Sequence, residues 1–348
     1  MAPAYPLPNI YDLDDAEIRR RLRGLELPDW RLKQIRSWLD QGVISAQAMT
    51  NLSLELRGEL EKRFAFKTLE LDRVLRSSED GTAKYAFRLN DGQIIETVAM
   101  SYRYGRSVCV SSQVGCRMSC RFCASTLNGR LRNLSSAEML AQVTEVARLE
   151  NVRVRSLVVM GIGEPLENME ALLPFLRAAH RPEGPGISYR RMTVSSCGLV
   201  PEIRRFAEAD LPITLAISLH APNQKLRERL MPIAKACPLT QLMPACAAYQ
   251  KRSGRRLTFE YLLIRDVNDT ERHARELAAL LRGLLCHVNL IPFNRFGDTP
   301  FERSRAESMR RFQEILEASH IACTMRRSLG NDIMAACGQL RRHVEEDG

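Results

Sequence analysis

The chain has 348 residues, 45% of them hydrophobic and 26% charged, which is typical of a globular protein with a sizeable core. No stretch approaches the roughly 20 apolar residues of a membrane helix, and residues 1–14 lack the basic start and apolar run of a signal peptide. We therefore expect a cytoplasmic protein, and its net charge of +10 favours a polyanionic partner such as nucleic acid.

Residues 1–70 are expected to form a small helical domain at the N-terminus. Asp14 and Asp15 ahead of Ile18 predict an acid-capped helix start, and further helices are expected over 30–39 and 54–64. Both tryptophans of the chain lie in this part, which therefore predicts a core of its own.

Residues 71–100 change to a strand-like pattern. The run 85–89 and the pair Ile94-Ile95 flank an Asp91-Gly92 turn, which predicts a β-hairpin that connects the helical part to the rest of the chain.

From residue 101 to 348, short apolar runs alternate with helical stretches. Strands are expected at 108–110, 157–160, 192–194, 213–217, 257–263, 287–291 and 323–325. Helices are expected between them, notably at 137–149, 169–179, 270–281 and 305–318. Such alternation predicts an α/β fold with a parallel sheet, either open or curved into a barrel.

Three cysteines directly after the first of these strands carry the most specific signal. Cys116, Cys120 and Cys123 form a C-x3-C-x2-C pattern, and thiolates ligate either zinc or iron–sulfur clusters. Structural zinc usually takes four ligands in C-x2-C pairs, and no second pair lies nearby. Three thiolates leave one iron of a 4Fe-4S cluster open to chelate S-adenosylmethionine (SAM), whose reductive cleavage yields a 5′-deoxyadenosyl radical. The pattern predicts a radical-SAM cluster, with structural zinc as the alternative.

Further motifs follow the predicted strands, whose carboxyl ends carry the site in α/β barrels. The glycines of the segment 161–165 would let the backbone approach a ligand, and its glutamate could accept hydrogen bonds from an ammonium group. Each motif alone could be a turn or a cap, but their joint occurrence favours SAM binding. The candidate ligands of SAM are Gly163, Glu164, Ser195, Ser218, Leu219, His220 and Asn294.

Residues 97–137 contain no Asp or Glu but six arginines: Arg103, Arg106, Arg117, Arg121, Arg130 and Arg132. Such a segment is either a solvated basic loop or a positive rim around a site that receives phosphates. The ten cysteines are not expected to form a disulfide framework in the cytosol.

With these motifs in place, the sequence resembles the RlmN/Cfr family of radical-SAM RNA methyltransferases over nearly the whole chain, most closely its RlmN members. The matching stretches are 96–98, 109–116, the cysteine triplet, 132–134, 160–166, 216–223, 289–292 and 332–340. The Ala-Ala-Cys-Gly-Gln-Leu motif that ends at Leu340 is highly specific to this family.

The resemblance implies a partial (βα)6 barrel, a 4Fe-4S cluster and two molecules of SAM per turnover. A cysteine matching Cys337 takes a methyl group from one SAM, and the radical from the second removes a hydrogen atom from that S-methyl group. The carbon radical then adds to the adenine ring and links RNA to protein. A cysteine matching Cys109 releases the product by forming a disulfide with Cys337, and Glu96 matches the residue taken as the base.

By resemblance, the substrates are adenosines of 23S rRNA and of some tRNAs, methylated at C2, with a reductant such as flavodoxin and with a monomeric enzyme. The chain departs from its relatives at Ser125-Thr126, Cys197 and Leu329, which bears on substrate choice and carbon selectivity. Three alternatives remain: a Cfr-like C8 methyltransferase that confers antibiotic resistance, a radical-SAM enzyme for another substrate, and a non-enzymatic RNA-binding protein with zinc.

Overall fold

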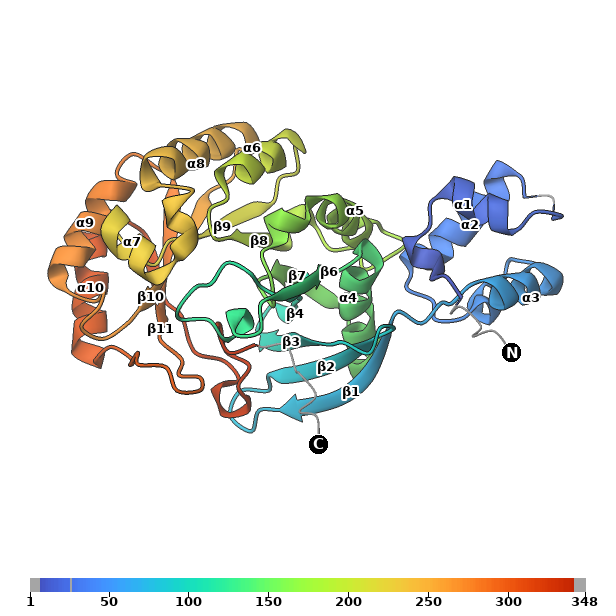
Figure 1. Cartoon of the computed structure of the whole chain (residues 1–348), viewed down its shortest axis with the longest axis horizontal. Helices are drawn as coiled ribbons and strands as arrows, with labels where there is room; N and C mark the ends of the chain where they lie inside the picture. The colour runs from blue at the N-terminus through green and yellow to red at the C-terminus, as the bar shows by residue number, and fades with distance from the viewer. Residues whose placement is uncertain (1–6, 26, 341–348) are drawn as a thin grey trace.

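The computed structural model describes residues 7–25 and 27–340 (Figure 1). Its first elements are α1 (Asp15–Arg21), α2 (Asp29–Asp40) and α3 (Leu54–Arg63), which lie at one end of the molecule (Figure 1). Asp14 and Ser53 cap α1 and α3 by accepting hydrogen bonds from backbone N–H groups, as the sequence predicts for the start of α1.

The helical part has its own buried cluster, as expected, but the tryptophans are not its centre. Aliphatic side chains such as Ile18 and Ile35 fill it, whereas Trp30 is 55% exposed and lies against the Arg31 guanidinium. Trp38 packs at the edge of the cluster, and its indole N–H donates a hydrogen bond to the side chain of Asn51. The two tryptophans thus correctly indicated a separate core in this part of the chain, but aliphatic residues form it.

The central sheet has ten strands in the order β1-β2-β3-β4-β7-β8-β9-β10-β11-β12. The first four are antiparallel: β1 (Leu69–Arg76), β2 (Ala83–Leu89), β3 (Ile94–Tyr102) and β4 (Gly105–Cys109). From β4 onward all neighbours are parallel: β7 (Val154–Val159), β8 (Met192–Ser196), β9 (Thr214–Ser218), β10 (Leu257–Leu263), β11 (Cys286–Pro292) and β12 (Cys323–Met325). A separate ribbon pairs β5 (Gln113–Gly115) with β6 (Arg130–Asn133).

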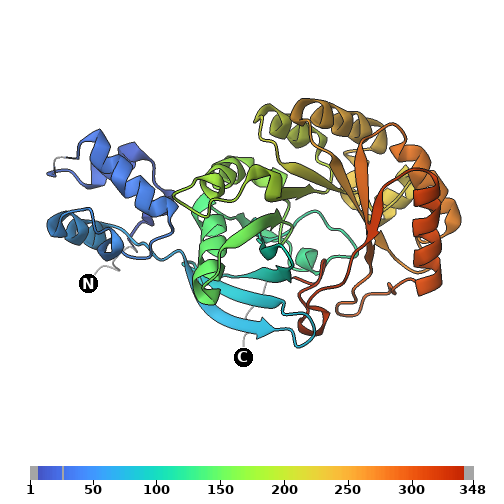
Figure 2. The same cartoon turned by 180° about the vertical axis from the view of Figure 1, so that it is seen from behind.

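Helices connect the parallel strands and cover the outer face of the curved sheet in Figure 1, which Figure 2 shows from behind. They are α4 (Ser136–Glu150), α5 (Met169–His180), α6 (Val200–Glu208), α7 (Gln224–Leu230), α8 (Leu239–Ser253), α9 (Glu271–Leu281) and α10 (Ala306–Ala318). A capping box of Ser135 and Glu138 fixes the start of α4. The predicted α/β class and partial (βα)6 barrel are confirmed.

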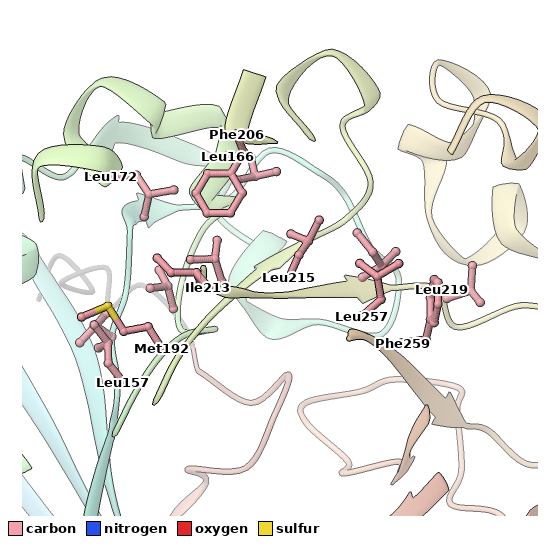
Figure 3. Packing of buried hydrophobic residues seen from close by; sticks show 14 of the residues in the cluster. Leu157, Leu166, Leu172, Met192, Phe206, Ile213, Leu215, Leu219, Leu257 and Phe259 are labelled. Carbon is pink, nitrogen blue, oxygen red and sulfur yellow. The ribbon is translucent and has the colours of Figure 1, made fainter. Parts of the chain in front are cut away.

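The main core fills the space between this sheet and its helices. Figure 3 shows Leu157, Met192 and Leu215 of neighbouring strands among these side chains, with Leu172 and Phe206 from the covering helices. This packing fixes the strands, so the side chains at their carboxyl ends are held on a rigid frame.

The predicted hairpin is present as β2 and β3, but it is not a free connection, because β3 also pairs with β4 and β1 extends the sheet. The sequence analysis missed β1 because most of its residues are exposed and the strand has no buried face. The division at residues 70 and 100 remains a proposal. Among the described residues, no helix is both long and apolar enough to cross a bilayer.

Candidate active site

The carboxyl ends of the parallel strands surround one cavity, which brings most of the predicted site residues together. Its walls include the cysteine loop, the segments after β7, β8 and β9, and a segment near the described C-terminal end. The predicted residues that line it are Cys116, Cys120, Cys123, Gly163, Glu164, Ser195, Ser218, His220 and Cys337.

The cysteine loop begins at a close approach of two backbone segments. Gly115 has φ +80°, and a Cβ atom there would lie 1.8 Å from the carbonyl oxygen of Gly129, so only glycine fits. Thr126 Oγ1 donates hydrogen bonds to the carbonyls of Cys120 and Cys123 and holds the loop together. The loop thus has a defined shape within the protein itself.

The thiols of this loop fit an iron–sulfur cluster. Burial raises the pKa of Cys116 to about 12 and that of Cys120 well above its usual value, and a bound cluster would stabilise the thiolates. Three soft sulfur donors on one loop and at one cavity are the ligand set that such clusters take. Within the described residues, no three His, Cys, Asp or Glu side chains are grouped to hold a single metal ion.

Glu164 is a buried carboxylate that faces the cavity. It accepts hydrogen bonds from the backbone N–H groups of Cys197 (2.7 Å) and Leu166 (3.2 Å), and burial raises its pKa. Neighbouring Gly163 has φ +109°, and a Cβ there would meet the side chain of Gln113 at 2.6 Å. The glycine therefore allows close packing on the segment before the cysteine loop, in addition to lining the cavity.

His220 offers an uncharged hydrogen-bond donor to the same cavity. Its Nδ1 accepts the backbone N–H of Leu262 at 3.0 Å, so the ring proton is on Nε2. Burial lowers the pKa of His220 to about 3, so the ring is neutral near pH 7. Its ring lies edge-on to Phe122 with centroids 4.6 Å apart, and Phe122 lines the cavity beside the cysteines.

The remaining predicted SAM ligands differ in position. Ser195 lines the cavity, and its hydroxyl donates to the carbonyl of Val159 at 3.0 Å. The Leu219 side chain is fully buried in the main core, so only its backbone can serve the site. Asn294 lines a neighbouring cavity instead of the first.

This second cavity contains Cys109, Asn294, Arg326 and Cys337, and it shares Cys337 with the first. Burial raises the pKa of Cys109 to about 12, and its thiol and that of Cys337 are both free. The two cysteines that the sequence comparison singled out thus face one enclosed space, although they come from opposite ends of the barrel segment.

The segment that carries Cys337 is bound to the cysteine loop by specific hydrogen bonds. The backbone N–H of Ala124 donates to the carbonyl of Gly338 at 2.8 Å, and the Ser125 hydroxyl donates to the carbonyl of Leu340 at 2.6 Å. The exposed Cys337 is therefore held at the cavity by contacts that begin one residue after Cys123.

Glu96 does not line either cavity. It is 2% exposed on β3, and its carboxylate forms an ion pair with Lys84 at 2.9 Å. Because side chains alternate along a strand, Glu96 lies on the same face of β3 as Val98 and Met100, which do line the second cavity. Its predicted role as a base stays a prediction.

Sequence reasoning missed two charged residues of the cavity walls. Glu260 on β10 is 4% exposed, accepts a hydrogen bond from Asn289 at 2.8 Å and lies 3.5 Å from the Arg326 guanidinium. Arg326 follows β12 and lines both cavities. Cys197, one of the positions at which the chain departs from its relatives, is buried and also lines the first cavity. Their positions after or within strands of one barrel were the available signal.

The acid-free segment 97–137 is not a continuous positive rim, because acids from elsewhere in the chain neutralise much of it. Arg106 pairs with Glu150, Arg117 and Arg130 with Glu167, and Arg132 with Asp91 and Glu138. Of the six arginines, only Arg103 and Arg121 form no ion pair within the described residues.

Comparisons with known proteins agree with this geometry. The sequence model that describes the radical SAM superfamily matches residues 110–278 of this chain. A probable dual-specificity RNA methyltransferase RlmN of Desulforamulus reducens is 47% identical, covering 97% of both chains, and one of Halalkalibacterium halodurans is 48% identical, covering 96% of this chain and 93% of its own. The crystal structure of a radical SAM methyltransferase from Sphaerobacter thermophilus is 45% identical, with a TM-score of 0.89 over 96% of this chain and 99% of that one.

Proposed function

Because the chain belongs to the RlmN family of radical-SAM RNA methyltransferases, we propose that it methylates C2 of adenosine in RNA through a methyl group carried on Cys337. Relatives that cover almost the whole chain establish that it is an enzyme of this class, which removes the non-enzymatic zinc protein as an alternative. The carbon that is methylated, the RNA and the role of each cysteine are the proposal.

Enzymes of this superfamily bind a 4Fe-4S cluster and SAM, and the residues of the first cavity fit both groups. The three cysteines of the loop would hold the cluster, Glu164 would accept hydrogen bonds from the SAM ammonium group, and His220 would donate from Nε2. When bound, these groups supply a 5′-deoxyadenosyl radical that can remove a hydrogen atom from a methyl group.

The observation that carries the proposal is the position of Cys337. Its thiol lines the same cavity as the three cysteines of the loop, and the segment around it is hydrogen-bonded to residues 124 and 125. A thiol at this point can accept a methyl group from one SAM and present it to a radical formed from a second.

Cys109 is suited to release the product. It is buried, so its thiol is neutral and protected at rest, yet it faces the same second cavity as Cys337. We propose that, once the adenine carbon has lost its proton and the unpaired electron has passed to the external electron carrier, the Cys109 sulfur bonds to the Cys337 sulfur. The bond between the Cys337 sulfur and the methyl carbon breaks, this carbon takes up the proton that the Cys109 thiol releases, and an external reductant then restores both thiols. Glu96 would take the proton from the adenine carbon.

The proposed substrates are 23S rRNA and tRNA in the cytoplasm, with an electron donor such as flavodoxin and with the enzyme acting as a monomer. Both strand pairing and base stacking oppose access to a ring carbon, so the target adenosine must leave its stack to reach Cys337. The helical N-terminal part, with its exposed Trp30 beside the half-buried Arg31, is proposed to help hold structured RNA.

The test is anaerobic reconstitution followed by reaction with SAM, a reductant, and fragments of 23S rRNA or tRNA. Iron and sulfide analysis reports the cluster, and mass spectrometry of the digested RNA identifies the product. We expect 2-methyladenosine. Formation of 8-methyladenosine would support the Cfr-like alternative, and a protein that cleaves SAM but methylates neither RNA would contradict the proposal.

A further inference from the structure

A third hollow of ≈ 460 Å³ opens at the tip of the hairpin formed by β3 and β4. Tyr102 and Tyr104 of the hairpin line it, together with Arg190 and Arg191 of the short helix η5 (Tyr189–Arg191). Tyr102 is 36% exposed and Tyr104 is 55% exposed. This hollow, which we call the hairpin groove, therefore presents aromatic and cationic side chains to solvent at a volume typical of ligand sites.

The hairpin groove adjoins the cavity of the two cysteines. Met100 and Val158 line both spaces, and Arg326 lines the groove and both cavities of the active site. Along β3, alternate side chains face one way, so Met100 borders Cys109 and the next side chain on that face, Tyr102, borders the groove. A ligand that extends out of the active site along this face meets the tyrosines.

The aromatic pair offers a stacking surface. The rings of Tyr102 and Tyr104 lie 5.0 Å apart between centroids with 6° between their planes. Tyr102 covers one face of the Tyr104 ring, and Tyr104 remains more than half exposed. A planar group can therefore continue this stack, and any nucleobase has a suitable face.

Two of the three arginines of the groove are uncompensated, whereas Arg326 is paired with Glu260. Arg190 and Arg191 are exposed and form no ion pair with any carboxylate in the described part of the chain. Most arginines of the acid-free segment, by contrast, are neutralised, such as Arg117 by Glu167 and Arg132 by Glu138. Two unpaired guanidinium groups beside an exposed aromatic stack match the combination by which proteins bind single-stranded nucleic acid.

We propose that the hairpin groove binds the single-stranded nucleotides next to the target adenosine, with one base stacked on Tyr104 and the adjoining phosphates bound by Arg190 and Arg191. The inference rests on the proposed function and assigns its RNA a path out of the active site. It explains why two large aromatic side chains stay exposed in a turn directly beside the catalytic cavities.

The test compares variants of the reconstituted full-length enzyme in binding a fluorescently labelled RNA hairpin with a single-stranded, adenosine-containing loop. Tyr104→Leu removes the ring and is expected to weaken binding about 5- to 150-fold, the range for loss of one stacked base, whereas Tyr104→Phe keeps the ring and binds within about 2-fold of the wild type. Thermal unfolding of each variant checks that the hairpin is intact.

The double variant Arg190→Ala/Arg191→Ala tests the phosphate contacts. The slope of log affinity against log salt is expected to fall by about 1.4, because each contact to a single strand contributes about 0.7. The control Arg282→Ala/Arg310→Ala removes the same charge from the opposite part of the barrel, at the end of α9 and on α10, and should leave the slope unchanged.

The outcomes separate the two proposals. If the wild type methylates the RNA and Tyr104→Leu binds as tightly as the wild type, the groove proposal is overturned while the proposed function stands. Equal slopes for the groove and control double variants would likewise overturn it. If the wild type neither binds nor methylates RNA, the proposed function fails and the groove proposal fails with it.

Discussion

The hydrogen bond from Ser125 to the Leu340 carbonyl gives a quantitative prediction about how the Cys337 segment is held. Both residues are buried and the O···O distance is 2.6 Å. Ser125→Ala leaves a buried carbonyl without this donor, which costs about 1–3 kcal/mol. Because this bond joins the segment that carries Cys337 to the cysteine loop, its loss destabilises the docked position of that segment. The fraction of molecules in which the segment is detached from the loop should rise about 5- to 150-fold.

Hydrogen exchange measures this population directly. The backbone N–H of Ala124 donates to Gly338, so its exchange should accelerate by the same factor, and methylation kcat/KM should fall while iron content stays at the wild-type level. Ser135→Ala is the matched control, because it removes a helix cap of about 1 kcal/mol far from this segment. If Ala124 exchanges equally fast in Ser125→Ala and the wild type, the reasoning is refuted.

Four further predictions concern other residues of the site and its surroundings. Cys337→Ala should abolish methylation while SAM cleavage continues, and Cys109→Ala should leave RNA covalently attached to the protein in denaturing electrophoresis; normal turnover of Cys109→Ala would rule out its role in release. Burial lowers the pKa of His220 from 6.5 to about 3, so below pH 6.5 only the unfolded chain takes up this proton. Stability should therefore fall as the pH drops from 6.5 towards 3, by up to ~1.4 kcal/mol per pH unit, and His220→Gln should flatten this dependence in denaturant titrations. If His220→Gln shows the same pH dependence of stability as the wild type, the low pKa of His220 is contradicted. Lys84→Met removes the ammonium group 2.9 Å from buried Glu96 and should cost about 3–5 kcal/mol of unfolding free energy, partly recovered in Lys84→Met/Glu96→Gln; equal stability of the single and double variants would count against this ion pair.

The elements that local sequence signals determine could be predicted. The start of α1 follows from Asp14, and the apolar runs located the parallel strands because most of them, though not β12, are buried against covering helices. β1 lacks a buried face, so its sequence does not show the regular alternation of apolar and polar residues that would have predicted a strand. The two short strands β5 and β6 depend on the close approach at Gly115, which no local propensity encodes.

In the site, too, residues marked by local sequence motifs could be predicted, whereas residues placed by tertiary contacts could not. The spacing of the cysteine triplet and the motifs after successive strands predicted the residues of the first cavity, because parallel strand ends meet at one edge. Leu219 turned inward to the core, however, and Asn294 lined the neighbouring cavity. Glu260 and Arg326 were missed although they lie on and directly after predicted strands, since their proximity arises only when β10 and the end of β12 are brought into one barrel.

Charge patterning failed for a related reason. The absence of acids in 97–137 suggested a positive rim, yet Glu150 and Glu167 reach the arginines from distant elements. The unpaired cations of the hairpin groove, Arg190 and Arg191, lie outside that segment altogether. Net charge along a sequence is therefore a poor guide to net charge on a surface when ion pairs connect separate elements.

The measurement that tests the central claim most directly is the deuterium content of the methyl group in RNA after reaction with SAM that carries a trideuterated methyl. If Cys337 carries the methyl and a radical removes one of its deuterium atoms, the product regains one hydrogen from solvent. We predict a methyladenosine with two deuterium atoms at the methyl carbon. A methyladenosine that retains all three would show direct transfer from SAM and would contradict the proposed role of Cys337.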